Sequence, residues 1–122
     1  MKVFDPQIYP RKIYVLDSLD ELRYFERRDG VALDIPSDAT VDATVWPCVF
    51  KDDESYCFAV HFKAKTIETI AHESTHIANG IFQDCQVDFD YLHDEHYAYF
   101  VGWIANCIFE ALDLKIIKNK KK

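Results

Sequence analysis

The sequence predicts an α+β fold in which a small antiparallel sheet packs on helices. Strand-like segments dominate the first half of the chain, and helical periodicity dominates the second half. In addition, 49% of the 122 residues are apolar, which is enough for one buried core. Because no repeat or low-complexity linker divides the chain, we expect a single domain over residues 1–122, with flexible ends at 1–10 and 115–122.

A strand and a helix are expected first. Residues 12–16 are rich in β-branched and aromatic side chains, as strands are. Ser18 is a suitable N-cap for a helix that continues to about Arg27, because apolar side chains recur there on one helical face. A turn signal follows at 28–30, and residues 31–39 are expected to be irregular.

A hairpin is expected next. Residues 41–50 and 56–62 are both rich in strand-forming residues, and the polar segment 51–55 between them is typical of a turn. Pro47 has no N–H to donate, so its strand should lie at a sheet edge or carry a bulge.

Two helices should complete the domain. Thr66 is a suitable N-cap and Glu68 a favourable first-turn residue for a helix that ends near Asp84. After a loop at 85–92, a last helix should span about Asp94 to Leu112. Its sequence is apolar nearly all round, so we expect it to be largely buried.

Composition excludes several classes of protein. A net charge of −7 argues against a nucleic-acid partner, because phosphate binding needs a basic surface. No apolar run is long enough for a membrane span or a signal sequence. The cysteines are widely spaced, so we expect small buried side chains in a reducing, cytoplasmic setting rather than a disulfide framework. They are Cys48, Cys57, Cys85 and Cys107.

The segment His72-Glu73-Ser74-Thr75-His76 carries the chemistry. Each residue of a helix turns by about 100°, so the two histidines lie one turn apart on one face, where they can bind one Zn²⁺ together. Glu73 lies beside that face, where a general base is needed. The opposite arc of the helix is apolar, which leaves the histidine side for a cleft.

A catalytic zinc site needs a third protein ligand. Glu95 is preferred, because it begins the last helix. Ala98 and Gly102 are small, so the two helices should approach each other closely there. His93 and His96 are the alternatives, although each can also be an ordinary surface histidine.

The motif together with Glu95-His96-Tyr97-Ala98-Tyr99 resembles the gluzincin metallopeptidases, and the stretch also resembles small phage and bacterial proteins of this type. The resemblance implies a zincin-like core with an active-site helix and a glutamate helix. In it His72, His76 and Glu95 hold Zn²⁺, and Glu73 takes a proton from the zinc-bound water that attacks a peptide bond of a peptide or protein substrate. It also implies that the strand at 56–62 forms the rim of the cleft and pairs with substrate.

The chain departs from that family at Tyr99, where thermolysin-like enzymes carry an aspartate that orients a histidine. Asn106 or Asp94 can replace it in that role. Four residues are candidates to stabilise the oxyanion: Tyr91, His93, His96 and Tyr99.

The alternative function is a non-catalytic zinc-binding module, regulatory or protein-interacting, with a zincin-like fold. In that case a group such as His93, His96 or Cys85 closes the metal site. The basic run at 118–122 is expected to be a solvated tail, or a segment that folds over the cleft and keeps it latent.

Overall fold

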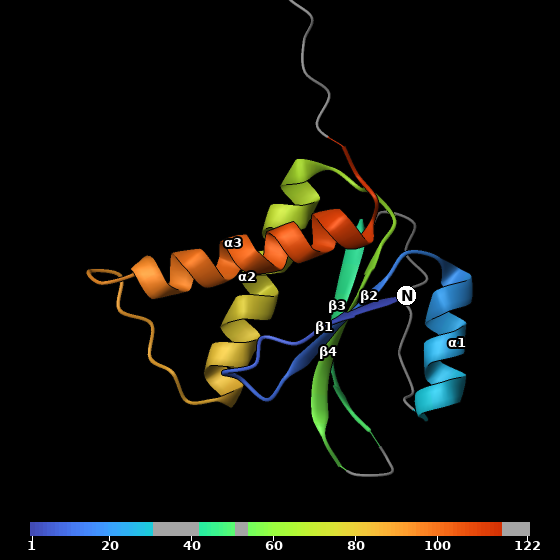
Figure 1. Cartoon of the computed structure of the whole chain (residues 1–122), viewed down its shortest axis with the longest axis horizontal. Coiled ribbons are helices and arrows are strands. Elements are labelled where there is room, and N and C mark those ends of the chain that lie inside the picture. The colour runs from blue at the N-terminus through green and yellow to red at the C-terminus, as the bar shows by residue number, and fades with distance from the viewer. Residues whose placement is uncertain (31–41, 51–53, 116–122) are drawn as a thin grey trace, which may run out of the picture.

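The computed structural model describes residues 1–30, 42–50 and 54–115 of the chain. A four-stranded sheet and three helices form an α+β fold, as predicted (Figure 1). In chain order the elements are β1 (Lys2–Phe4), β2 (Lys12–Leu16), α1 (Leu19–Asp29), β3 (Ala43–Val49), β4 (Tyr56–Phe62), α2 (Ile67–Asp84) and α3 (Glu95–Ala111). The irregular segment predicted at 31–39, the tip of the hairpin turn at 51–53 and the tail at 116–122 lie outside the described residues.

The sheet is mixed, not purely antiparallel, and its strand order is β1-β2-β4-β3. β2 pairs with β4 in parallel, with Val15 opposite Val60. Parallel neighbours need a long connection, and here α1 and β3 lie between them in the chain. The prediction of an antiparallel sheet was therefore wrong for this central pair, although β1–β2 and β3–β4 are antiparallel.

β4 lies inside the sheet and β3 lies at its edge. The expected cleft-rim strand at 56–62 is therefore paired on both sides and has no free edge to offer a substrate. The edge position predicted from Pro47 is confirmed. The N–H of Phe50 donates to the carbonyl of Ser55 on the β4 side. Successive backbone N–H groups of a strand point to opposite sides, so the nitrogen of Pro47, three residues earlier, points to the free edge of the sheet. Its missing N–H therefore costs no hydrogen bond between the strands.

Both faces of the sheet are covered. α1 packs on one face through Leu22 and Phe25, which join Tyr14 and Leu16 in one buried cluster. The predicted N-cap of α1 is confirmed, because the Ser18 hydroxyl accepts a hydrogen bond from the N–H of Glu21 at 3.1 Å. A strand with two covered faces carries apolar residues throughout, which explains the continuous apolar run in β2.

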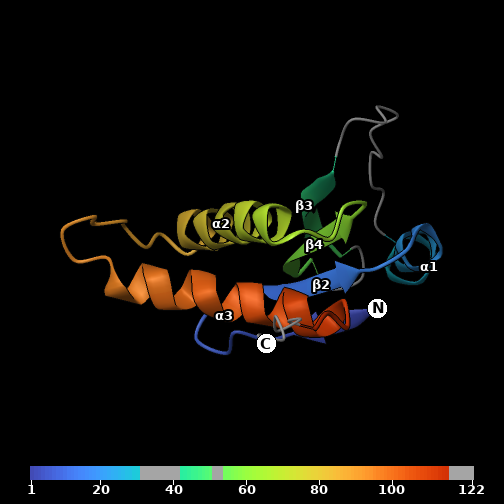
Figure 2. The ribbon, with the colours of Figure 1, turned by 90° about the horizontal axis from the view of Figure 1, so that it is seen from above.

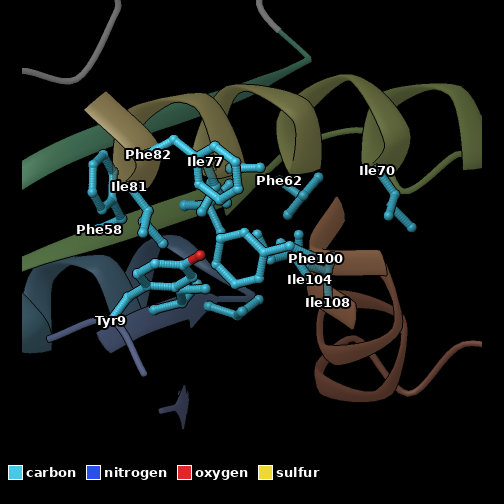
Figure 3. Close-up of a cluster of buried hydrophobic side chains, with 14 of the residues drawn as sticks. Tyr9, Phe58, Phe62, Ile70, Ile77, Ile81, Phe82, Phe100, Ile104 and Ile108 are labelled. Carbon is cyan, nitrogen blue, oxygen red and sulfur yellow. The ribbon is translucent and has the colours of Figure 1, made fainter. Parts of the chain in front are cut away.

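α2 and α3 cover the other face and enclose the larger cluster of buried side chains (Figure 3). Ile13, Val15, Phe58, Val60 and Phe62 point into it from the strands. The helices contribute Ile70, Ile77, Ala78, Ile81, Phe82, Phe100, Ile104 and Ile108. Leu112, directly after the end of α3, also belongs to this cluster.

The first ten residues, expected to be a flexible end, make contacts with the rest of the fold. β1 pairs with β2, and the Met1 amino group forms an ion pair with Glu21. Tyr9 is buried among Phe82 and Phe100, and its hydroxyl lies 2.5 Å from His96 Nε2.

α3 is less buried than its composition predicts. Within it only Phe100, Ile104, Cys107 and Ile108 are fully buried. Tyr99 is 75% exposed, and a Cβ built on Gly102 would meet no atom within 4 Å. The expected close approach of helices at Gly102 was therefore wrong. No helix in the described ranges is long and apolar enough to cross a membrane.

α2 and α3 are joined by the loop at 85–94 (Figure 2), and α3 crosses α2 obliquely (Figure 1). The Tyr97 hydroxyl donates to Asn79 Oδ1 at 2.6 Å. Phe82 stacks on His96 and on Phe100. The first turn of α3 therefore lies beside the last turns of α2, which decides where Glu95 can reach.

Candidate metal centre

His72 and His76 lie on the solvent-facing side of α2, as the helical phase predicts. Their Nε2 atoms are 3.1 Å apart, and their ring centroids are 4.6 Å apart. The opposite arc, predicted to be apolar, is buried at Ile70, Ser74, Ile77, Ala78 and Ile81, whereas the apolar Ile67 and Ala71 are exposed. One side of the helix thus packs in the core while the imidazoles remain open to a ligand.

The spacing of the two imidazoles fits zinc. Two nitrogens that occupy neighbouring corners of a tetrahedral zinc site, at bond lengths of 2.0–2.1 Å, are about 3.3 Å apart. The observed separation of 3.1 Å is close to that value. The distance between the two nitrogens is therefore compatible with binding of one zinc ion by both imidazoles.

Glu73 lies beside the pair and is buried, with 7% of its surface exposed. Its Oε1 atom is 3.7 Å from His72 Nε2. Burial raises the pKa of the Glu73 carboxyl above its usual value, although the two nearby histidines act in the opposite direction. The residue predicted as the general base is thus shielded from solvent and within reach of a group held at His72.

A cavity of about 310 Å³ opens next to these side chains. It lies between the first half of α2 and the start of β3, and it is lined by Asp42, Ala43, Glu68, Thr69, His72 and Glu73. Sequence reasoning missed Asp42 as a neighbour of the site, because only the fold brings the start of β3 to α2. Glu68 could have been found, since it precedes His72 by one helical turn.

The structure does not bring Glu95 to the histidines. His96, the next residue, stacks on Phe82. Phe82 is six residues beyond His76, or about 9 Å along the helix axis. Among the residues that the structure describes, no three His, Cys, Asp or Glu side chains form a metal-binding group. The third ligand predicted from the sequence therefore has no counterpart in this arrangement.

The other predicted site residues lie away from the pair. His96 is engaged with Tyr9, and His93 Nδ1 is 2.9 Å from Asp90 Oδ2 in the exposed loop before α3. Tyr99 is exposed on the outer side of α3.

Four further candidates also lie apart from the two histidines. Asp94 precedes α3 without a side-chain capping bond, and Cys85 follows α2 half-buried against the core. Tyr91 and Asn106 are exposed. In the described part of the chain, no hydrogen bond or ion pair links any of these predicted residues to the histidine motif.

Comparisons with known proteins gave no match among protein-family models, curated proteins or solved structures.

Proposed function

We propose that the protein is a zinc-dependent metallopeptidase in which His72 and His76 hold the metal and Glu73 is the general base. One observation carries this proposal. Two imidazole nitrogens lie 3.1 Å apart on an exposed helix face, and a buried carboxylate lies 3.7 Å from one of them. These are two of the three protein ligands, and the general base, that hydrolysis at a zinc ion requires.

The residues divide the work by position. Zinc supplies Lewis-acid polarisation of a carbonyl oxygen and makes a bound water more acidic. Glu73 takes a proton from the attacking water and delivers it to the leaving amine, which its place beside His72 allows. The cavity beside His72 is open to solvent on one side and bounded by the start of β3 on the other. An extended peptide can therefore reach His72 and Glu73.

Three carboxylates compete for the role of third ligand. The gluzincin resemblance implies Glu95, which must then move toward His76. Glu68 and Asp42 already line the cavity with His72. Zinc affinity decides among them: the glutamine or asparagine variant of the true ligand should bind zinc far more weakly than the other two variants.

The test of the function separates metal binding from catalysis. Glu73→Gln should retain zinc, measured by competition with a chromophoric chelator, and should lose cleavage of a mixed peptide library. His72→Ala should lose both properties. His93→Ala is the matched control, because His93 is an exposed histidine outside the pair, and it should change neither. Cleavage by Glu73→Gln at the wild-type rate would refute the mechanism.

A second candidate function is favoured by two observations. The His72 side chain is 66% exposed, and in the described part of the chain no third His, Cys, Asp or Glu side chain is already grouped with the two histidines. A non-catalytic module that binds zinc, or that uses zinc to bind a partner protein, has these properties. Stoichiometric zinc binding by the wild type without cleavage of any library peptide would select this second function.

A further inference from the structure

Cys48 and Cys57 face each other across the β3–β4 hairpin. They are nine positions apart in the sequence and directly opposite in the strand register. Both side chains are buried on the face covered by α1, in the cluster that contains Leu22 and Phe25. Wide sequence spacing had argued against any pairing of cysteines, and the hairpin overturns that argument.

The backbone geometry suits a covalent link. Because Phe50 N–H donates to Ser55 O, alternation makes Cys48 and Cys57 a hydrogen-bonded pair, whose Cα atoms lie about 5.5 Å apart. Disulfides usually span about 4.4–6.8 Å between Cα atoms. The Cα separation therefore lies within the disulfide range. Directly opposite Cβ atoms lie about 4.5–5.5 Å apart, so β3 must move slightly toward β4 to reach the roughly 3.5–4.5 Å that a disulfide spans.

The thiols are also in contact. The Cys48 thiol donates to the carbonyl of Trp46 at 3.4 Å and accepts a hydrogen bond from the Cys57 thiol. That bond, with a smaller effect from the Ala59 N–H, holds the pKa of Cys48 below its usual value despite burial. Cys107 is the opposite case, since burial and Glu110 raise its pKa to about 11.

We propose that Cys48 and Cys57 are a redox modification site, which low-molecular-mass disulfides such as oxidised glutathione convert into a reversible intrachain disulfide. The Cys48 thiolate attacks one glutathione sulfur, a mixed disulfide forms, and one glutathione thiolate leaves with the proton that Cys48 lost. The Cys57 thiolate then attacks the Cys48 sulfur and displaces the second glutathione. Two protein thiols are oxidised and one glutathione disulfide is reduced to two thiols, so electrons and protons balance.

The location in the sheet explains how buried thiols can react. Cys48 is 4% exposed and Cys57 is 1% exposed, so reaction requires local opening. β3 is the edge strand, held by pairing on one side only, and the pair lies close to its turn. Edge hairpins open at a lower free-energy cost than whole domains unfold. Oxidation should therefore be slow in the native protein, and the product should keep its fold.

The test uses the full chain. Reduced protein is incubated with oxidised glutathione, alkylated, digested and mapped by mass spectrometry. The expected product is a peptide pair joined through Cys48 and Cys57, lighter than the two thiols by two hydrogen atoms, with Cys85 and Cys107 alkylated. Dithiothreitol should restore both thiols. Disulfide formation should also slow proteolysis of the hairpin.

Variants make the result specific. Cys48→Ser and Cys57→Ala should abolish the linked peptide, whereas Cys85→Ser and Cys107→Ser should leave it unchanged. The wild-type map stands even if a core variant fails to fold. Alkylation of both thiols after equilibration with oxidant, a stable glutathione adduct on Cys48, or a crosslink through Cys85 or Cys107 would each overturn the proposal.

Discussion

Two glycines in helices should respond in opposite ways to the same substitution. A Cβ added at Gly80 of α2 would lie 2.7 Å and 2.8 Å from two ring carbons of Phe58 on β4. Phe58 is 5% exposed within the core, so its ring has little room to retreat. A Cβ added at Gly102 of α3 would meet nothing within 4 Å.

The magnitudes follow from two effects. Replacing a helical glycine by alanine favours the folded state by about 0.8–1.0 kcal/mol. Overpacking a core costs about 1–3 kcal/mol. Gly102→Ala should therefore raise the free energy of unfolding by about 1 kcal/mol, whereas Gly80→Ala should lower it by about 1 kcal/mol.

Urea denaturation followed by circular dichroism measures both variants against the wild type. A second change, Phe58→Leu, removes the ring that the new methyl group meets. In that background Gly80→Ala should become neutral or stabilising, so a double-mutant cycle should report the contact. Equal shifts for Gly80→Ala and Gly102→Ala in the wild-type background would refute the packing of Gly80 on Phe58.

Three further outcomes are expected. His76→Ala should weaken zinc binding by more than about 100-fold in chelator competition, because loss of a residue that only supports a metal ligand already costs about 10–100-fold. Excess chelator should remove zinc from the wild type. Equal zinc affinity in the variant would exclude His76 as a ligand. Burial lowers the pKa of His61; Asp17 opposes the shift and Lys65 adds a smaller lowering effect. The unfolded chain therefore binds the proton first, and the free energy of unfolding should fall as pH drops below about 6.5. His61→Gln should flatten the dependence of the urea midpoint between about pH 7 and pH 5, and an unchanged slope would exclude His61 as its cause. Ser18→Ala should lower the free energy of unfolding by about 1 kcal/mol in thermal denaturation, because α1 loses its N-cap hydrogen bond. An unchanged free energy of unfolding would mean that α1 does not depend on this cap.

Local structure was the part of the fold that the sequence predicted well. The caps Ser18 and Thr66 begin helices where predicted, and the hairpin joins the expected strands. These features depend on neighbouring residues, through side-chain capping and turn chemistry. The phase of α2 was also predictable, because a helix turns by a constant angle per residue.

Long-range pairing was not predictable from the same signals. The parallel alignment of β2 with β4 joins segments 45 positions apart, as in Lys12 opposite Cys57, and no local pattern encodes it. The same limit explains the misjudged cleft-rim strand, because only the pairing with β2 places β4 inside the sheet.

In the candidate site too, the local features were predictable and the long-range ones were not. The two histidines and Glu73 share one helix, so their arrangement followed from spacing alone. The role of Glu95 depended on how far α3 slides along α2, and aromatic packing of Phe82 with His96 and Phe100 decides that offset. The apolar composition of α3 misled in a related way, because Tyr99 remains exposed on a helix with one buried face.

The contact between Tyr9 and His96 has a consequence for biosynthesis. Its partners are 87 positions apart, and Tyr9 also packs on Phe82 and Phe100. A nascent chain on the ribosome therefore cannot complete the core until α3 has left the exit tunnel. Until then Tyr9 lacks its contacts with α3, and the apolar face of the sheet stays accessible to chaperones. Folding of this domain should be a late event in its synthesis, because its earliest residues depend on its last helix.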